Sequence, residues 1–600
     1  MRQRVADYIA DFLAAHGITD VFTVVGGGAM HLNDALGHHP NLHCTYNHHE
    51  QACAIAAEAY ARYSRKIAAV CVTSGPGGTN AITGVMGGWL DSIPMFIISG
   101  QVKFSTTIRS TAVPLRQLGD QEFNIVDTVK TMTKFAVMAD KAEDIAYVLE
   151  KALFIADSGR PGPVWIDVPL NIQGAIVETD DLRHFNSTVE PFGAVPYFTQ
   201  EQGKTILDRI QTAKRPVLFA GDAIRSSGAY QDFLNLVEKL HIPVVTAWNA
   251  HDVIPDSSPY FCGRPGTVGT RGGNFVVQSA DLLLVLGCRL NIRQISYNWE
   301  NFAPGAYKIM ADIDSAELEK PTLHIDMPIQ ADVRDVIQTL NRLKYNTGSH
   351  AKWLEWAKGI NAKYPACLPE YRKKETPVNP YVFVNSLFKN LSEDDAVVCS
   401  NGSACVIGFQ AAIIKKNTRL FTNSGCAAMG YGLPASIGVS VNRGKQRTIC
   451  LEGDGSLQMN IQELQTVFHN QYNLKIFVIN NNGYHSIRQT QINLFKPPLC
   501  GVCADNGVSF PELDRIAYAY RIPYVKVDVV SSMDSKIKEA LDMEGPVLIE
   551  AVVDPEQFFA PKLSSRRLPD GTMISPSLED MYPFLPGEEM AAIRREVSEL

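Results

Sequence analysis

The stretch LEGDGSLQMN, residues 451–460, places an acidic turn directly after the short apolar run 447–451. A glycine turn at the end of a strand commonly marks no more than a change of chain direction. An aspartate held between two glycines at such a turn also presents its carboxylate to a metal ion and a phosphate. The first candidate binding residues are therefore Gly453, Asp454, Gly455 and Ser456.

A second turn of related chemistry follows the next apolar run, 475–479, which ends in Asn480-Asn481-Asn482-Gly483. Asp-Gly and Asn-Gly are both common turn formers, so neither turn is specific alone. If the two strands are parallel neighbours, Asp454 and Asn481 meet at one edge of the sheet. A carboxylate, an amide oxygen and the carbonyl of Gly483 suit Mg²⁺ and leave positions for diphosphate oxygens and water.

Short, fully apolar runs alternate with helical patterns along the whole chain, which predicts an α/β protein of three consecutive doubly wound parallel sheets. The runs are KIAAVCV, MFIIS and VWIDV, then VLFAG, VVTAW, LLLVLG and YKIMADID, then AVVCS, TICLEG, KIFVIN and VLIEAVV. We expect a first domain over residues 1–172, a second over 190–345, a third over 370–555 and a C-terminal arm over 556–600. The segment near 345 is expected at the surface, and the arm is expected to hold one short final helix.

Bulk composition fits a multi-domain soluble protein, because 600 residues exceed one core and 46% of them are hydrophobic. The net charge of −8 without a basic block argues against nucleic acid as a partner. No apolar run approaches the ~18 residues of a membrane span. The first 18 residues resemble an amphipathic helix more than a signal peptide, and 12 scattered cysteines fit reduced thiols, so we expect a cytoplasmic protein.

The order of the two turns resembles the thiamine-diphosphate signature, a Gly-Asp-Gly followed later in the chain by Asn-Asn. Enzymes with this cofactor need a carboxylate beside the aminopyrimidine ring. In the family that glutamate begins a helix in a run like R-H-E-Q-G-A, and YNHHEQACAIAAEAYAR matches it at Glu50. The helix dipole also favours an acid in the first turn of a helix, which would explain Glu50 without a catalytic role. The catalytic assignment of Glu50 therefore depends on the presence of Asp454 and Asn481.

Further matches extend the resemblance to the acetohydroxyacid synthase and pyruvate oxidase group over nearly the whole chain. They are VVGGGAM with Gly27 and Gly28, TSGPGGTN with Gly77, SGRPGPVWIDVP and GYGLPASIG. The resemblance implies that Met429 props the cofactor in its bent form and that the carbonyl of Ala427 accepts a hydrogen bond from its amino group. On sequence alone Met429 is equally well a core methionine.

The same resemblance places Gly402 and Ser403 near the diphosphate and makes Gln121, in LGDQEF, an active-site glutamine. In this group the active site lies between two subunits, which implies a homodimer or homotetramer.

The second domain resembles the FAD-binding domain of the synthases, with Gly266, Arg289, Asp312 and Asp332 as candidate contacts. Where the family tends to have three glycines, this chain has Gly221-Asp222-Ala223, and an aspartate near a diphosphate is unfavourable unless it faces away. The resemblance implies a structural FAD, because synthase chemistry has no net redox step.

Pyruvate is the expected donor, and the acceptor is the open question. Arg293 matches the arginine that holds the acceptor carboxylate in acetohydroxyacid synthases, although it also suits a surface or dinucleotide-binding position. Thr490 stands where those synthases carry a tryptophan against the acceptor, and a smaller residue widens the pocket. The runs GYHSIRQTQ and PKLSSRRLPDGTMISPSLEDM look like synthase relatives associated with surface-polysaccharide genes. Arg566 and Arg567 suit a nucleotide diphosphate or are solvated charges.

We therefore predict a carboligase that decarboxylates pyruvate and adds the two-carbon unit to an aldehyde or ketone, with a nucleotide-linked keto-sugar as one such acceptor. The alternative is the large catalytic subunit of an acetolactate synthase, which Arg293 favours and Thr490 disfavours. A pyruvate oxidase would need redox-active FAD and oxygen. A non-catalytic scaffold has no need of Glu50, Asp454 and Asn481 together.

Overall fold

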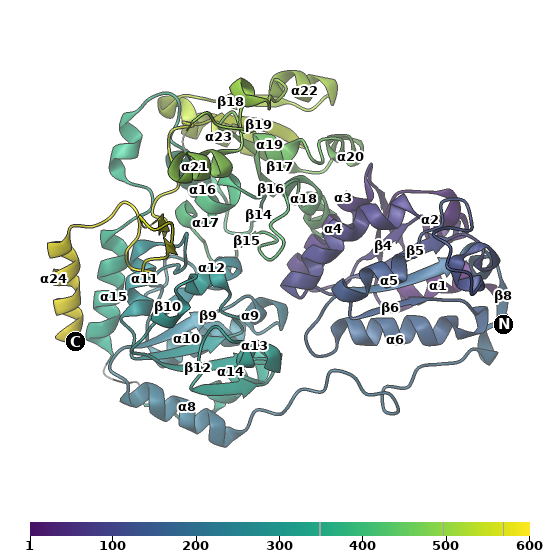
Figure 1. Ribbon diagram of the computed structural model, residues 1–600, viewed down its shortest axis with the longest axis horizontal. Coiled ribbons are helices and arrows are strands. Elements are labelled where there is room, and N and C mark those ends of the chain that lie inside the picture. The colour runs from purple at the N-terminus through teal and green to yellow at the C-terminus, as the bar shows by residue number, and fades with distance from the viewer. Residues whose placement is uncertain (347, 349, 496, 568) are drawn as a thin grey trace.

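The computed structural model describes residues 1–346, 348, 350–495, 497–567 and 569–600. Three parallel sheets, each covered by helices, follow one another along the chain and confirm the predicted fold class. The first sheet and its helices form one lobe, and the second and third lie together in the other (Figure 1). None of the described helices combines the length and the apolar character needed to cross a membrane.

The first sheet has the order β3-β2-β4-β5-β7-β6, and all its pairs are parallel. Its strands are β2 (Asp20–Thr23), β3 (His43–Tyr46), β4 (Ala69–Val72), β5 (Phe96–Gln101), β6 (Phe135–Met138) and β7 (Val164–Pro169). The chief helices are α1 (Val5–Ala15), α2 (Met30–His38), α3 (Glu50–Ser64), α4 (Pro76–Asp91) and α6 (Ile145–Asp157). The helices α1 and α6 share a hydrophobic core with one face of the sheet.

The third sheet, β15-β14-β16-β17-β19-β18, is also parallel throughout. Its strands are β14 (Ala396–Cys399), β15 (Arg419–Phe421), β16 (Thr448–Gly453), β17 (Leu474–Asn480), β18 (Tyr524–Val527) and β19 (Val547–Val552). Its helices include α16 (Pro380–Asn390), α17 (Ser403–Ala411), α18 (Gly432–Arg443), α20 (Glu463–Asn470), α21 (His485–Leu494), α22 (Leu513–Ala519) and α23 (Val530–Asp542). The short helix α19 (Asp454–Leu457) begins at the acidic turn.

The second sheet has the order β10-β9-β11-β12-β13, again all parallel. Its strands are β9 (Pro216–Ala220), β10 (Val244–Thr246), β11 (Leu282–Leu286), β12 (Tyr307–Asp312) and β13 (Met327–Gln330). Its helices include α8 (Gln200–Thr212), α9 (Ala223–Ser226), α10 (Tyr230–Leu240), α11 (Arg271–Gln278), α12 (Ile292–Ile295), α13 (Ser315–Glu319) and α14 (Val333–Arg342).

The segment after residue 345 is not the surface stretch that the sequence suggested. The helix α15 (Ala351–Lys363) packs on the second sheet's core, where Trp353 is 2% exposed and donates its indole N–H to the carbonyl of Pro216 at 2.9 Å. His350 is buried just before this helix and contacts the carbonyl of Ala213 at 2.9 Å. The many polar residues of this segment made it look exposed, because the helix packs on the core through only a few side chains. Residues 347 and 349 of that run lie outside the described residues.

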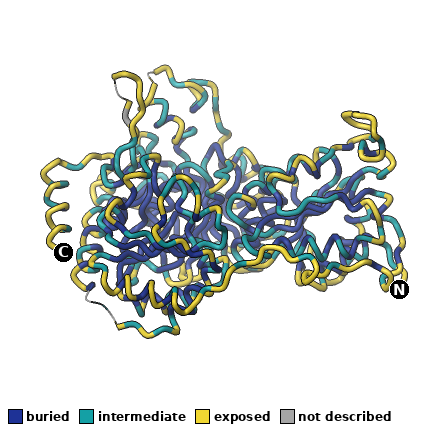
Figure 2. Tube along the Cα trace, turned by 60° about the horizontal axis from the view of Figure 1, so that its bottom comes forward, coloured by how far each residue is buried: buried dark blue, intermediate teal, exposed yellow. Residues whose placement is uncertain are grey.

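The linker and the arm tie the domains together. The strand β8 (Ile176–Glu178) pairs with β1 (Arg2–Arg4), and the chain from 182 to 199 then runs without a helix or strand to α8. The arm contains a small hairpin, β20 (Arg566–Arg567) with β21 (Met573–Ile574), and the predicted final helix, α24 (Gly587–Ser598). Most of α24 is exposed in Figure 2, yet Ile593 is buried in the second domain's core.

The first and third domains meet where α3 packs along α18 (Figure 1). A buried charge cluster of the first domain lies at this contact: Arg62 bonds Glu58 in its own helix and Asp91 of α4 at 2.8 Å. The hydroxyl of Tyr431 donates to Glu58 at 2.8 Å from the third domain. Removing one member of a buried charge cluster leaves its partners uncompensated, so the cluster fixes how the two domains dock.

Candidate active site

The two turns of the third domain lie side by side, as their parallel strands require. Asp454 is 4% exposed, and its carboxylate accepts the backbone N–H groups of Gly455 at 2.8 Å and Gly483 at 3.0 Å. Burial raises the pKa of Asp454 to about 6, against the lowering effect of these hydrogen bonds. A cation at this carboxylate would restore the charged form.

Asn481 supplies the strongest sign that this edge is built for a metal ion. Its side-chain oxygen is buried and has no hydrogen-bond partner among the described residues, while its side-chain nitrogen donates to the hydroxyl of Ser403 at 3.1 Å. A buried acceptor without a partner is costly unless something absent from the protein fills it. Asp454, Asn481 and the carbonyl of Gly483 are thus fit to hold Mg²⁺, which prefers oxygen ligands.

A diphosphate cradle adjoins this position at the start of α17. Gly402 precedes the helix with φ +69°, and a Cβ there would meet no atom within 4 Å, so its backbone faces open space. The first backbone N–H groups of a helix bind phosphate readily. Ser456 joins the cradle to the acidic turn, because its hydroxyl contacts the hydroxyl of Ser400 at 2.7 Å and accepts the N–H of Gly430 at 2.8 Å.

The segment expected to shape the cofactor lies next to this cradle. Met429 is 39% exposed, so it is not the core methionine that remained an alternative. Ala427 adopts φ +53°, a left-handed conformation that costs an alanine energy. Its carbonyl accepts the side-chain N–H of Asn401 at 2.5 Å, which leaves one lone pair for a further donor.

The first domain presents its own set of expected residues. Glu50 is the first residue of α3, and its carboxylate accepts the side-chain N–H of Asn80 at 2.9 Å. The N–H of Gly28, which follows Gly27, donates to the hydroxyl of Thr73 at 3.0 Å. Gly77, in the first turn of α4, is tight, because a Cβ there would lie 2.8 Å from the Thr73 methyl group.

One bridge connects these two sets within the chain. The side chain of Asn460 donates to Gln51, next to Glu50, at 3.0 Å and to the carbonyl of Gly430 at 2.8 Å. Among the hydrogen bonds of the described residues, none joins Glu50 or Gln121 to the metal turns. Gln121 is exposed with φ +61°.

The two expected acceptor residues come from different domains. Arg293, in α12, lies over the ring of Trp248 at 5.1 Å from its centroid, and Trp248 packs on Phe409 of α17. The hydroxyl of Thr490, in α21, donates a hydrogen bond to the carbonyl of Ser486 in the same helix at 3.0 Å.

Three further residues beside this site carried no recognisable pattern in the sequence. Arg488 donates to the carbonyls of Asn481 at 3.3 Å and Asn482 at 2.8 Å. His485 is 4% exposed, and neither ring nitrogen makes a well-aligned hydrogen bond with another described residue. Lys562, from the arm, is half-buried, and burial followed by the charge of Arg293 lowers its pKa. Isolated residues like these belong to no motif with a fixed spacing, so the sequence does not mark them as functional.

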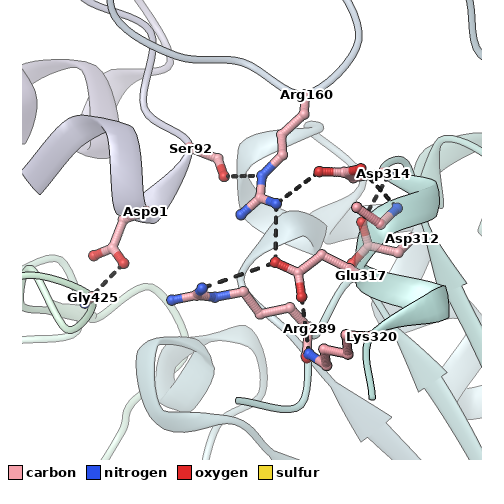
Figure 3. A network of polar contacts seen from close by, with 10 residues as sticks. Asp91, Ser92, Arg160, Arg289, Asp312, Asp314, Glu317, Lys320 and Gly425 are labelled. Carbon is pink, nitrogen blue, oxygen red and sulfur yellow. Dashed lines mark hydrogen bonds and ion pairs between the residues drawn. The ribbon is translucent and has the colours of Figure 1, made fainter. Parts of the chain in front are cut away.

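A cleft between the first and second domains lies at the carboxyl ends of β9, β11 and β12 (Figure 3). Arg160 crosses it from the first domain, bonding Ser92 at 2.8 Å, Asp314 at 2.9 Å and Glu317 at 3.0 Å. One part of the cleft has a volume of about 630 Å³ and includes Arg289 in its lining.

The cleft has the properties that a dinucleotide needs. It lies where the strand order reverses, the usual ligand position in such sheets. Gly221 and Gly287 approach so closely that a Cβ on Gly221 would lie 2.0 Å from the Gly287 carbonyl oxygen. Arg289 and Asp312 line the cleft, and Asp332 lines an adjoining cavity. Arginines suit a diphosphate and aspartates suit ribose hydroxyls.

Two details of this cleft differ from expectation. Asp222 lines it, and burial raises the pKa of Asp222 to about 6 although Arg62 opposes the effect. Gly266 does not line it; its N–H donates to the side chain of Asn274 at 2.8 Å. A Cβ on Gly266 would lie 3.0 Å from the carbonyl oxygen of Arg293. Gly266 therefore lies beside Arg293 in the structure.

Comparison with known protein families matches all three domains. Residues 3–131 match the N-terminal TPP binding domain of thiamine pyrophosphate enzymes, residues 204–340 the central domain and residues 400–551 the C-terminal TPP binding domain. The chain belongs to this family. The predicted class, a thiamine-diphosphate-dependent decarboxylating carboligase, is confirmed.

Curated relatives cover almost the same length. Acetolactate synthase isozyme 1 large subunit of Escherichia coli (strain K12) is 31% identical over 558 residues, 92% of this chain and 94% of the relative. Isozyme 3 large subunit of the same organism is 30% identical over 93% of this chain and 96% of its own length. Acetolactate synthase 1, chloroplastic, of Zea mays is 30% identical over 93% and 87%.

Proposed function

We propose that this protein condenses the two-carbon unit of pyruvate with a second 2-oxo acid, as an acetolactate synthase does. The observation that carries the proposal is the metal turn, where the unpartnered oxygen of Asn481 faces the same edge as Asp454. The named relatives support this acceptor over the ketone that Thr490 suggested. Thiamine diphosphate, when bound, supplies the electron sink for decarboxylation.

The chain's own residues then have distinct roles. Asp454, Asn481 and Gly483 would hold Mg²⁺, and Gly402 and Ser403 would bind diphosphate oxygens. Glu50 would exchange a proton with the aminopyrimidine ring, and the bond from Asn80 orients its carboxylate. Met429 would support the cofactor, and Gly27, Gly28, Gly77 and Gln121 would border the reacting atoms.

The complete site is proposed to need two copies of the chain. The metal turns carry exposed apolar neighbours in α21 and just beyond it, among them Ile487 at 51% and Phe495 at 63% exposure. The glycine loop of the first domain is similarly flanked by Val25 at 60% and Met30 at 52%. Burying such patches drives association, so a homodimer or homotetramer would bring Glu50 of one copy to Asp454 of the other.

A second candidate acceptor is a larger aldehyde or ketone, including a nucleotide-linked keto-sugar. Thr490 favours it, because a threonine leaves space on α21 that a large aromatic ring would fill. Arg293 would hold a carboxylate in the first case and another anionic group in the second.

Two further assignments belong to the proposal. We place FAD in the cleft of Figure 3 as a structural group, and the absorbance spectrum of the purified protein tests it. A cytoplasmic location is proposed from the cysteines, since each of the 12 is free in the structure.

NMR of products from ¹³C-pyruvate with enzyme, thiamine diphosphate and Mg²⁺ tests the acceptor. Rapid acetolactate or acetohydroxybutyrate supports the 2-oxo acid. Labelled tertiary alcohols from added ketones, with little acetolactate, would support the second candidate instead.

A further inference from the structure

The arm places a lysine beside the acceptor arginine. The N–H of Thr267 donates to the carbonyl of Arg293 at 2.8 Å, and the N–H of Leu563 donates to the carbonyl of Thr267 at 2.8 Å. Lys562 is also held by two backbone bonds to Tyr582, at 3.0 and 2.8 Å. Its backbone is therefore fixed next to Arg293 by the second domain on one side and the arm on the other.

The same stretch of arm lies against the metal-turn helix. The ring of Phe559 packs edge-on against His485 with centroids 5.1 Å apart, and the N–H of Phe559 bonds the side chain of Gln489 at 3.3 Å. His485 is 4% exposed, and within the described residues neither ring nitrogen makes a well-aligned hydrogen bond, although the backbone of Gln557 acts to raise the pKa of the ring against burial. A buried ring whose nitrogens are so weakly bonded is suited to a partner from outside the chain.

The charges of this region do not balance among the described residues. The ammonium of Lys562 and the guanidinium of Arg293 take part in none of the hydrogen bonds or ion pairs found there. Asp554, which precedes the arm, is bound to Lys374 at 2.6 Å, and Glu579 of the arm accepts from the side chain of Gln278 at 3.0 Å. Two half-buried cations without a carboxylate repel each other unless an anion lies between them.

We propose that Lys562 and Arg293 form a binding site for a phosphate group on the acceptor, with His485 at its edge. This rests on the proposed carboligase function and refines its second candidate acceptor, the larger aldehyde or ketone, to one that carries a phosphate group. A monocarboxylate offers one negative charge to two cations, whereas a phosphate monoester offers about two and accepts several charge-assisted hydrogen bonds. The cofactor's own diphosphate is served by Mg²⁺ and the start of α17.

Paired acceptors test the site in the holoenzyme. Rates with ¹³C-pyruvate are measured for glyceraldehyde 3-phosphate and for glyceraldehyde, and the ratio of their kcat/KM values is compared between variants. We expect the wild-type ratio to favour the phosphate ester by about tenfold or more, and Lys562→Met to lower that ratio about tenfold. Lys562→Arg keeps the charge and should retain most of the preference. Lys204→Met, an exposed lysine of α8, is the matched control.

Calorimetric titration of inorganic phosphate into protein saturated with thiamine diphosphate and Mg²⁺ separates the two proposals. Phosphate binding that weakens in Lys562→Met, without carboligation of any acceptor, would keep the subsite and reject the proposed function. Carboligation with equal ratios in wild type and variant would reject the subsite alone. A loss of thiamine diphosphate affinity in Lys562→Met would also reject it, since the lysine would then serve the cofactor. If Lys562→Met does not fold, Lys562→Gln and Lys562→Arg are compared by the same titration.

Discussion

The first and third domains are built on the same strand order, yet they carry different chemistry at corresponding turns. In both, the third strand in sequence ends in a glycine turn at the same sheet edge, after β4 in one and β16 in the other. In the first domain Thr73 turns back to bond Gly28. In the third domain Asp454 reaches the N–H of Gly483 in the neighbouring turn. The shared topology therefore puts a turn at the same sheet edge in both domains. Whether that turn can bind a metal ion depends on one side chain.

The segments that follow the second strand of each domain differ in the same way. The first domain follows β3 with Glu50, whereas the third follows β15 with the segment that ends in Ala427 and Met429. One fold, used twice, offers a proton-transferring acid and a support for the ring that receives the proton. Four substitutions, in order of expected effect, test how far this difference extends.

Glu50→Gln should have the largest effect, because it removes the proton exchange and keeps the shape. Removing a general acid or base typically costs about 10² to 10⁴ in rate. Steady-state CO₂ release from pyruvate would measure it, with circular dichroism to confirm folding. Glu201→Gln, another glutamate in the first turn of a helix, should leave the rate unchanged. Normal turnover in the Glu50→Gln enzyme would show that the Glu50 carboxylate has no part in the reaction.

Asp454→Asn should come next, because it removes the one formal negative charge proposed at the metal. We expect Mg²⁺-dependent affinity for thiamine diphosphate to fall by at least about a hundredfold, as losses at metal sites commonly do. Calorimetric titration of the cofactor at fixed Mg²⁺ measures this directly. Asp505→Asn, on the exposed loop after α21, serves as the control. Unchanged cofactor affinity in Asp454→Asn would place the metal elsewhere.

Asp167 tests the first sheet itself. Burial within β7 raises the pKa of Asp167 to about 7, although Ser99 and Gln101 donate to its carboxylate at 2.6 and 3.1 Å. The folded state thus keeps the proton to higher pH than the unfolded chain, so stability falls as pH rises from about 4 to about 7.

We expect this loss to be about 2 kcal/mol between pH 5 and pH 7, at about 1.4 kcal/mol per unit. Urea unfolding of wild type and Asp167→Asn at the two pH values measures it. The variant should lose most of the pH dependence; an unchanged slope would mean that Asp167 is ionised in the folded protein.

Thr490→Trp should have the smallest effect and bears on the acceptor alone. A ring on α21 would fill the space left by threonine, so we expect a few-fold shift toward small 2-oxo acids, as one change in pocket size usually gives. Competition between 2-oxobutyrate and a cyclic ketone for labelled pyruvate reports the shift. Thr490→Val, which loses the hydrogen bond to the backbone carbonyl of Ser486 without adding a ring, is the control. An unaltered product ratio would separate Thr490 from acceptor choice.

The central strands of each sheet were predictable because they are buried on both faces. Runs such as LLLVL of β11 contain no polar residue, so their pattern does not resemble that of an amphipathic helix or a loop. Most edge strands were not predicted, although β10 was: β3 reads HCTY and β15 reads RLF, short segments with polar or exposed positions. An edge strand pairs on one side only, so its sequence needs no continuous apolar run.

The candidate site divides in the same way. Asp454 and Asn481 follow strands at a recognisable spacing, and the structure brings their turns together. Gly266 was assigned to the dinucleotide cleft by resemblance and lies beside Arg293 instead. His485 and Lys562 come together only after the arm has folded back, a contact that no local pattern encodes.

The return of the arm has a consequence for synthesis on the ribosome. Leu578 and Ile593 complete the second domain's core, although the whole third domain separates them from the rest of it. During translation the second domain therefore keeps apolar surface uncovered until nearly two hundred and fifty later residues have emerged, or roughly 12–50 s at about 5–20 residues per second. The arm that completes this core also carries Lys562 to its place.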